Sequence, residues 1–184
     1  MFYNIRSIPK HYDNFKLNVL NRVLPKLDIL GFCETRLSED IEELYCPDGY
    51  TLHTNNISRK MGGVALLSKT SLNCNVIRDI SILKPHLESL FVEYRSKGVR
   101  YVCGVMYHRP GTNNDAFMAD LSALLANPII RNSKCCIMGD INFDLFCYDS
   151  KPIISDYANS FFNYNFFSVD HQSHESISHN GHTY

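Results

Sequence analysis

Three polar residues follow apolar stretches of the kind that form buried strands. Glu34 comes directly after DILGFC, Asp140 ends CCIMGD, and Asn142 follows two positions later in GDIN. In α/β folds, active sites gather at the edge of the sheet where such strands end. A carboxylate at this edge keeps its oxygens open to solvent, which suits a hard divalent cation such as Mg²⁺. The pattern therefore predicts a metal site built from oxygen ligands.

Each of these residues also has a simpler explanation. Glu34 taken alone could be a solvated charge at a strand end, because most carboxylates lie at the surface. Asp140 and Asn142 could form an Asx turn, a frequent use of both residue types. Asn4 and Tyr107 end apolar stretches too, and either could serve packing as readily as chemistry. Residue types alone leave these alternatives open.

The first part of the chain alternates between strand and helix patterns. The predicted elements are a strand at Phe2–Ile5, a helix capped by Asp13 or Asn14 that ends at Pro25, and a strand at Asp28–Cys33. A strand, a helix and a strand in succession imply a parallel pair of strands with a right-handed connection. Asn4 and Glu34 would then lie at the same edge of one sheet.

The rest of the chain predicts a mixed sheet with helices. Four strand-like stretches with short polar turns suit antiparallel neighbours: Gly62–Ser68, Cys74–Ile80, Leu87–Tyr94 and Arg100–Tyr107. Further predicted elements are a helix at Asn114–Ala126, a strand ending at Asp140, a helix at Ile153–Tyr164 and a strand at Phe166–Val169. Helices that flank a mixed sheet predict a layered α/β domain.

Composition restricts the partners and the cellular compartment. The formal net charge of −1 provides no global field for nucleic acid, so any DNA contact must be local. No apolar stretch is long enough to span a bilayer, so we expect an intracellular protein without a membrane partner. The seven cysteines form no CxxC pair, which favours buried free thiols in a reducing compartment over a zinc site.

Six motifs occur in a recognisable order. They are NIRSI, DILGFCETRL, GGVALL, ESLFVEY, GVMYHRP and IMGDIN. In order and spacing the chain resembles the apurinic-endonuclease-like domains of non-LTR (LINE-type) retrotransposons, which belong to the endonuclease/exonuclease/phosphatase superfamily. The resemblance extends from Asn4 to Tyr184. It implies one domain over residues 1–184, a four-layer α/β sandwich of two packed mixed sheets flanked by helices, and a nuclear protein that nicks DNA for target-primed reverse transcription.

The resemblance also assigns roles to the metal and water side of the site. Glu34 would be the carboxylate that binds Mg²⁺ or Mn²⁺, with Asn4 beside it to orient the metal or the phosphate. Asp140 would orient or deprotonate the attacking water. Hydrolysis of a phosphodiester needs a nucleophilic water, neutralised phosphate charge and a stabilised leaving oxygen, and one metal with a few polar donors can supply these.

On the phosphate side, the resemblance implies three contacts to the DNA backbone. Asn142 would hold the scissile phosphate, and Tyr107 would offer its phenol to the phosphate or to the leaving oxygen. Arg109 would contact a backbone phosphate, because a guanidinium can meet phosphate oxygens with paired hydrogen bonds. Glu88 in ESLFVEY is explained equally well by pairing within the sheet and is not assigned to catalysis.

The end of the chain departs from the family pattern. Relatives complete the site with a late aspartate and then an Asp-His pair, and the tail SISHNGHTY resembles the stretch that precedes them. We therefore expect a fold that lacks its last strands. Asp170-His171 comes too early to be the terminal pair, and the tail histidines His171, His174, His179 and His182 are predicted to be solvated. The alternatives are a catalytically inactive retroelement remnant, a binding module and a phosphatase of the same superfamily.

Overall fold

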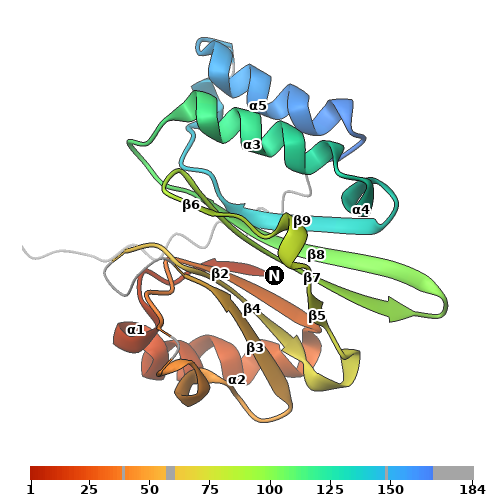
Figure 1. Ribbon diagram of the computed structural model, residues 1–184. Coiled ribbons are helices and arrows are strands. Elements are labelled where there is room, and N and C mark those ends of the chain that lie inside the picture. The colour runs from red at the N-terminus through yellow and green to blue at the C-terminus, as the bar shows by residue number, and fades with distance from the viewer. Residues whose placement is uncertain (39, 57–60, 148, 168–184) are drawn as a thin grey trace, which may run out of the picture.

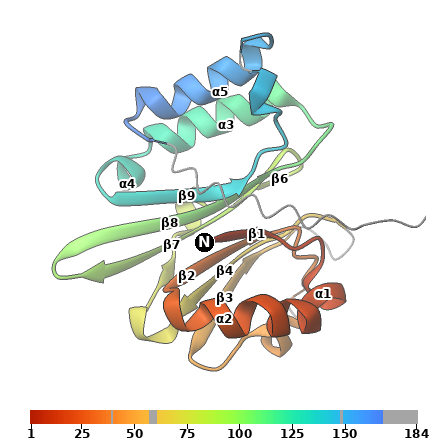
Figure 2. The ribbon, with the colours of Figure 1, turned by 180° about the vertical axis from the view of Figure 1, so that it is seen from behind.

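Two β-sheets pack face to face, and helices cover the outer face of each sheet (Figures 1 and 2). The computed structural model describes residues 1–38, 40–56, 61–147 and 149–167. The layers run helix, sheet, sheet, helix, and both sheets are mixed. The predicted α/β sandwich is therefore confirmed. The tail residues from Asp170 to His182 that the sequence singled out lie outside the described residues.

The first sheet has four strands in the order β1-β2-β4-β3. These are β1 (Phe2–Asn4), β2 (Ile29–Cys33), β3 (Tyr50–Asn55) and β4 (Val64–Lys69). β1 and β2 are parallel, as predicted, and the other neighbours are antiparallel. β3 was not predicted, because its YTLHTN sequence places polar residues along a half-exposed edge strand instead of alternating cleanly.

The connection from β1 to β2 is helical, but its predicted start was wrong. The helix begins at Ile8 and not after Asp13: α1 (Ile8–Phe15) continues through the π-helical η1 (Lys16–Leu20), α2 (Asn21–Val23) and the 3₁₀ turn η2 (Leu24–Lys26). Pro9 lies in the first turn, where the missing N–H costs no helical hydrogen bond. Ile8, Phe15 and Leu20 bury one side of this connection against the first sheet.

The second sheet has the order β5-β7-β8-β9, with β6 paired to β7. Its strands are β5 (Asn75–Val76), β6 (Leu83–Lys84), β7 (Leu87–Ser96), β8 (Val99–His108) and β9 (Lys134–Asp140). The predicted antiparallel pairing of β7 with β8 is confirmed, and β9 joins β8 in parallel. β4, predicted as a neighbour of these strands, lies in the other sheet.

The predicted strand Cys74–Ile80 is wrong after Val76. The chain turns into the 3₁₀ turn η5 (Arg78–Ile80), which the Ser81 hydroxyl closes by donating to the Ile77 carbonyl at 2.8 Å. Ile77 and Ile80 are apolar because both are buried in the core between the second sheet and its covering helices. Apolar residues that follow one another here serve a buried turn and not a strand.

Three helices cover the outer face of the second sheet: α3 (Asn114–Ala126), α4 (Pro128–Arg131) and α5 (Pro152–Asn163). α3 has the predicted bounds, since Asn113 caps it by accepting from the Ala116 amide at 3.0 Å. α5 begins and ends one residue before its prediction. Of the predicted strand Phe166–Val169, Phe166 and Phe167 are not in a strand and the rest lies outside the described residues.

Three further 3₁₀ turns lie in the loops: η3 (Glu42–Tyr45), η4 (Thr70–Leu72) and η6 (Leu145–Cys147). No helix among the described residues is long and apolar enough to cross a membrane. All seven cysteines are free thiols. Burial was predicted correctly for Cys33 but wrongly for Cys136, which is exposed on the edge strand β9.

The hydrophobic core between the sheets fixes their relative position. It is formed by Cys33, Val64, Leu66, Leu90, Val92, Val105 and Tyr107. Separate cores lie under the helices on either side. Because close packing admits few alternative arrangements, the inner core holds the strand ends of the two sheets in register with one another, and the polar residues at those ends face each other.

Candidate active site

One amide joins two carboxylates from opposite sheets. Asn4 is the last residue of β1, Glu34 directly follows β2, and Asp140 is the last residue of β9. The Asn4 Nδ2 donates to Glu34 Oε1 at 3.0 Å and to Asp140 Oδ2 at 2.8 Å. Three residues that the sequence marked as site candidates thus come into contact, although Asp140 is 136 positions from Asn4.

The strand register explains why these side chains meet. Asn4 pairs with Cys33 in the parallel ladder, so Glu34 begins the turn beside the end of β1. Glu34 then adopts a left-handed backbone with φ of 54°, and Arg6 and Asn142 at the same edge have φ of 53° and 51°. Such conformations cost a non-glycine residue roughly 1–3 kcal/mol and concentrate at functional sites.

Tyr107 lies beside Asp140 in the second sheet. The two residues pair in register between β8 and β9, and Tyr107 is only 5% exposed. Burial, together with the negative charges of Glu34 and Asp140, raises the pKa of Tyr107 to about 12. The phenol therefore stays protonated at neutral pH, and it can donate a hydrogen bond to an anionic group at this edge.

Asp140 and Asn142 form an Asx turn, the simpler of the two explanations that the sequence left open for them. The Asn142 backbone N–H donates to Asp140 Oδ1 at 3.0 Å, and its side-chain Nδ2 donates to the His108 carbonyl at 2.8 Å. The turn also orients the Asp140 carboxylate, because it fixes Oδ1 while Oδ2 faces Asn4. His108 is buried, with Nδ1 2.8 Å from the Ile141 carbonyl, so it packs under the site.

Arg109 is paired with Glu88. The Arg109 Nη2 lies 2.5 Å from Glu88 Oε1, and Glu88 also accepts a hydrogen bond from the Gly63 amide. Burial raises the pKa of Glu88, whereas the Gly63 amide and the Arg109 charge oppose this shift. The Nε of Arg109 is buried without a partner among the described residues, so it retains one unused donor.

Arg36 is a candidate that the sequence did not single out. Its Nη2 lies 3.9 Å from Glu34 Oε2, and its backbone N–H donates to the Gly62 carbonyl at 3.1 Å. Its Nε, like that of Arg109, is buried without a partner among the described residues. The available signal was its place two residues after the candidate metal ligand Glu34 in ETRL.

The donor set at this edge fits a hard divalent cation. In the described part of the chain no three His, Cys, Asp or Glu side chains converge, so the candidate ligands are two carboxylates and the Asn4 amide oxygen. Mg²⁺ is usually held by one or two carboxylates and completes its shell with water and phosphate. Cys33 is excluded as a ligand because burial raises the pKa of its thiol, which donates to the Met106 carbonyl.

Three solved structures illustrate which proteins share this fold. The human Nocturnin catalytic domain with bound sulfate is 20% identical, with 83% of this chain and 64% of that chain covered and a TM-score of 0.54. The endonuclease domain of TRAS1, a telomere-specific non-LTR retrotransposon, is 10% identical, with 79% and 62% covered and a TM-score of 0.57. The 3′ phosphatase NExo from Neisseria bound to a product DNA hairpin is 16% identical, with 89% and 69% covered and a TM-score of 0.58.

At these identities the similarity establishes the fold alone. The chain spans less than two thirds of the Nocturnin and TRAS1 domains that it matches. No curated protein sequence matches it significantly. The profile of the Endonuclease/Exonuclease/phosphatase family, however, matches residues 1–179. Because this match includes nearly the whole sequence, the chain belongs to the Endonuclease/Exonuclease/phosphatase family.

Proposed function

We propose that this chain is a divalent-metal-dependent phosphodiesterase that nicks DNA, as an endonuclease domain of a non-LTR retrotransposon would. Members of its family are metal-dependent nucleases, phosphodiesterases and phosphatases. The observation that carries the proposal is the Asn4 amide, which holds the Glu34 and Asp140 carboxylates together at one open edge. Carboxylates held together in this way attract a cation that offsets their mutual repulsion.

In this proposal Glu34 and Asn4 hold Mg²⁺, or Mn²⁺ in its place, and the bound ion would neutralise phosphate charge. Asp140 would accept the proton of the attacking water, since its carboxylate is oriented by the Asn142 amide at Oδ1 and by the Asn4 side-chain amide at Oδ2. General-base help of this kind contributes roughly 10²–10⁴-fold to the rate. The reaction needs no covalent intermediate on the protein.

The phosphate is bound by the donors around this edge. Tyr107 donates a hydrogen bond from its phenol to a phosphate oxygen or to the leaving oxygen. Its raised pKa keeps the phenol protonated at neutral pH, as this donation requires. Asn142 and Arg109 contact the scissile and neighbouring phosphates. The local arginines matter because the net charge of −1 gives the whole chain no attraction to DNA.

DNA is the proposed substrate because of two similar folds. One is the endonuclease domain of TRAS1, a telomere-specific non-LTR retrotransposon, and the other is NExo bound to a product DNA hairpin. The role in target-primed reverse transcription and the nuclear location are implied only by the resemblance to non-LTR retrotransposon domains, and both remain predictions. The retroelement-like motifs NIRSI and ETRL argue against a phosphatase.

One observation favours a second candidate, a remnant that binds metal and phosphate without turnover. Among the described residues no histidine contacts Glu34 or Asp140, and His108 is buried under the site. The proton transfer would then depend on Asp140 alone.

A supercoiled-plasmid nicking assay with Mg²⁺ tests the proposal. The chain is compared with Asp140→Asn and with Glu93→Gln, a control on β7 whose ion pair with Arg100 lies at the other end of the ladder. We expect nicking by the chain and by the control, and a loss of at least 100-fold in Asp140→Asn. Nicking that is unchanged in Asp140→Asn contradicts the proposal. Absence of nicking with retained Mn²⁺ binding supports the remnant, and release of phosphate from a 3′-phosphorylated hairpin without nicking supports a phosphatase.

A further inference from the structure

One buried carboxylate connects the two sheets at the active edge. Glu88 lies on β7 in the second sheet and is 1% exposed, the lowest value for any carboxylate that the structure describes. One of its oxygens accepts from the amide of Gly63, which directly precedes β4 in the first sheet. Its other oxygen pairs with Arg109 at 2.5 Å. Glu88 therefore reaches across the sandwich at the level of the candidate site.

The glycine pair that Glu88 contacts holds the segment after Glu34. The Gly63 carbonyl accepts from the Thr35 amide at 3.2 Å, and the Gly62 carbonyl accepts from the Arg36 amide at 3.1 Å. Glu34 itself has a left-handed backbone, a conformation that persists only where its surroundings enforce it. Thr35 and Arg36 supply that constraint from one side, because their hydrogen bonds fix the chain directly after Glu34.

Both glycines are required for this contact. A Cβ at position 62 would collide with the Glu88 carboxylate, and a Cβ at position 63 would collide with Thr35 Oγ1 and Asn56 Oδ1. Both residues also have positive φ, of 72° and 91°. The GG doublet thus lets a side chain of one sheet approach the backbone of the other closely enough to accept its N–H.

On its own sheet, Glu88 is in register with the other half of the site. It pairs with Tyr107 between β7 and β8, and Tyr107 pairs with Asp140 between β8 and β9. We infer that Glu88 is a positioning residue that sets Glu34, on the first sheet, relative to Tyr107 and Asp140 on the second. The inference deepens the proposed function and rests on it for the identity of Glu34 as a metal ligand.

The burial of this ion pair supports a role in placement. A buried ion pair gains little net stability, because the loss of hydration of both charges offsets their attraction. The Glu93–Arg100 pair on the same ladder is only part-buried, whereas the Glu88 side chain is 1% exposed. Residues that orient metal ligands from behind typically change metal affinity about 10–100-fold when they are replaced.

The test is Glu88→Gln, which keeps the shape and removes the charge, with Glu93→Gln as the matched control. Glu93 lies on the same strand and pairs with Arg100 on β8 at 2.5 Å, but far from the site. Hydrogen exchange of the Thr35 and Arg36 amides and the Kd for Mn²⁺ are measured for each folded chain. We expect Glu88→Gln to speed exchange at both amides at least 10-fold and to weaken Mn²⁺ binding about 10–100-fold, and the control to change neither.

Exchange rates and a Kd within twofold of the unaltered chain would overturn the inference. If Glu88→Gln does not fold, Glu88→Asp is used, since it keeps the charge but is too short to reach both Gly63 and Arg109. If the unaltered chain does not bind Mn²⁺, the proposed function fails, and the exchange at Thr35 and Arg36 still decides whether Glu88 positions this segment.

Discussion

The two ends of the β7–β8 ladder use the same residue types in different ways. At the far end Glu93 pairs with Arg100 and both are part-exposed, while Tyr94 stacks on Tyr101 with centroids 5.1 Å apart. At the site end Glu88 pairs with Arg109 and is fully enclosed, and the buried Tyr107 neighbours Asp140. At the far end the one carboxylate, Glu93, is matched by Arg100. At the site end Arg109 is paired with Glu88 and Arg36 lies 3.9 Å from Glu34, whereas Asp140 has no ion-pair partner among the described residues and can face a metal ion.

The backbone differs between the two ends as well. At the far end, positive φ occurs at Lys97 and Gly98 in the hairpin turn, where such angles are routine. At the site end it occurs at Glu34, Arg36 and Asn142, which follow strands and carry the candidate functional groups. Left-handed backbone at Lys97 and Gly98 closes a hairpin turn, whereas at the site end it orients functional side chains. Because strained non-glycine conformations concentrate at functional sites, this difference indicates that the site end has a function.

The largest expected effect is on the cleavage rate, and it distinguishes a carboxylate at the site from a carboxylate away from it. Glu34→Gln removes the proposed metal ligand, so we expect the rate of Mg²⁺-dependent DNA cleavage to fall by about 10³-fold, comparable to the loss of a major electrostatic contact in a transition state. Asp28 directly precedes β2, whereas Glu34 directly follows it; Asp28→Asn removes the exposed partner of Lys69 and should leave the rate within twofold. Initial rates on a fluorescent oligonucleotide measure both. Equal rates for the two variants would remove the distinction between the ends.

A second comparison concerns two glycines with positive φ. Gly98→Ala meets open space, so only the backbone strain of about 1 kcal/mol is expected. Gly63→Ala adds a collision with Thr35 and Asn56 to the same strain, and we expect a loss of about 3 kcal/mol or more. Urea denaturation gives both free energies of unfolding. Similar losses for the two variants would show that the glycine doublet is not closely packed at the site.

Two tyrosines on β8 give a third comparison. Tyr107→Phe removes the proposed phenol donor, so kcat should fall about 10–100-fold while the Kd for Mn²⁺ stays the same. Tyr101→Phe changes the half-buried stack with Tyr94 at the far end of the ladder and should leave kcat unchanged. The pKa of Tyr107 is about 12, so its ionisation should not limit the rate below about pH 11. An unchanged kcat in Tyr107→Phe assigns this side chain to packing alone.

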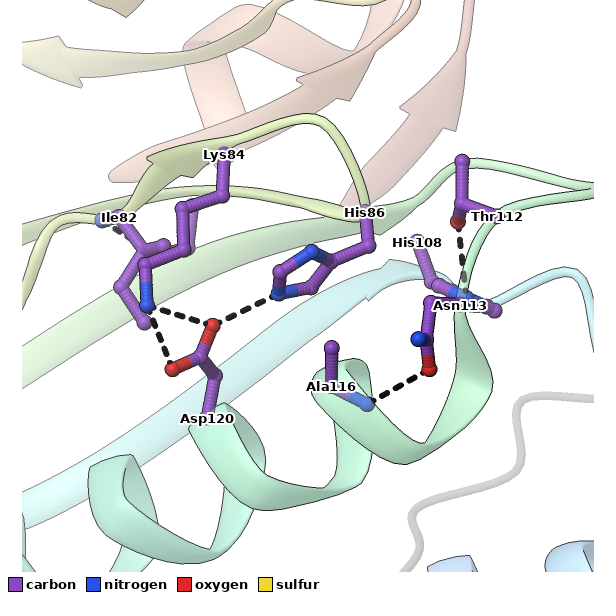
Figure 3. A network of polar contacts seen from close by, with 9 residues as sticks. Ile82, Lys84, His86, His108, Thr112, Asn113, Ala116 and Asp120 are labelled. Atoms are coloured by element: carbon purple, nitrogen blue, oxygen red, sulfur yellow. Dashed lines mark hydrogen bonds and ion pairs between the residues drawn. The ribbon is translucent and has the colours of Figure 1, made fainter.

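The smallest expected effect concerns a polar network outside the site (Figure 3). Asp120 on α3 accepts from Lys84 at 2.7 Å and from His86 at 2.7 Å. Burial would raise the pKa of Asp120, but these hydrogen bonds outweigh burial and lower it. The stabilisation is therefore present above the unfolded pKa of 3.8 and is lost as the pH falls through the folded value.

Asp120→Asn should accordingly lower the free energy of unfolding by about 1 kcal/mol at pH 7 and by much less at pH 2. Thermal melting at the two pH values measures this difference. The same loss at both pH values would assign the contribution to packing and not to the charge. Cleavage activity at pH 7 should not change, since Asp120 does not contact the residues of the candidate site.

Local signals predicted the parts of the fold that local contacts determine. α3 was predicted to its bounds because its apolar residues recur with helical spacing and Asn127-Pro128 ends the pattern, and the structure adds the Asn113 cap at its start. The start of α1 was missed because Pro9 was not taken as a first-turn residue. The assignment of β4 to the first sheet could not be predicted, since strand pairing depends on the inner core and not on the order along the chain.

The residues of the candidate site also fall into those that local sequence patterns identify and those that depend on long-range contacts. Asn4, Glu34 and Asp140 could be found because each ends or follows a strand pattern. The role of Glu88 could not, because the burial of its charge depends on Gly63 and Arg109, which come from distant parts of the sequence. A carboxylate within an apolar strand indicates a buried charge, but the sequence of the strand does not show which residue neutralises that charge.

The most direct test of the central claim is a titration with Mn²⁺ followed by water-proton relaxation, for the unaltered chain, Glu34→Gln and Asp28→Asn. The account predicts one Mn²⁺ site per chain that Mg²⁺ displaces, that Glu34→Gln abolishes and that Asp28→Asn retains. Absence of binding by the unaltered chain, or equal binding by Glu34→Gln, would contradict it.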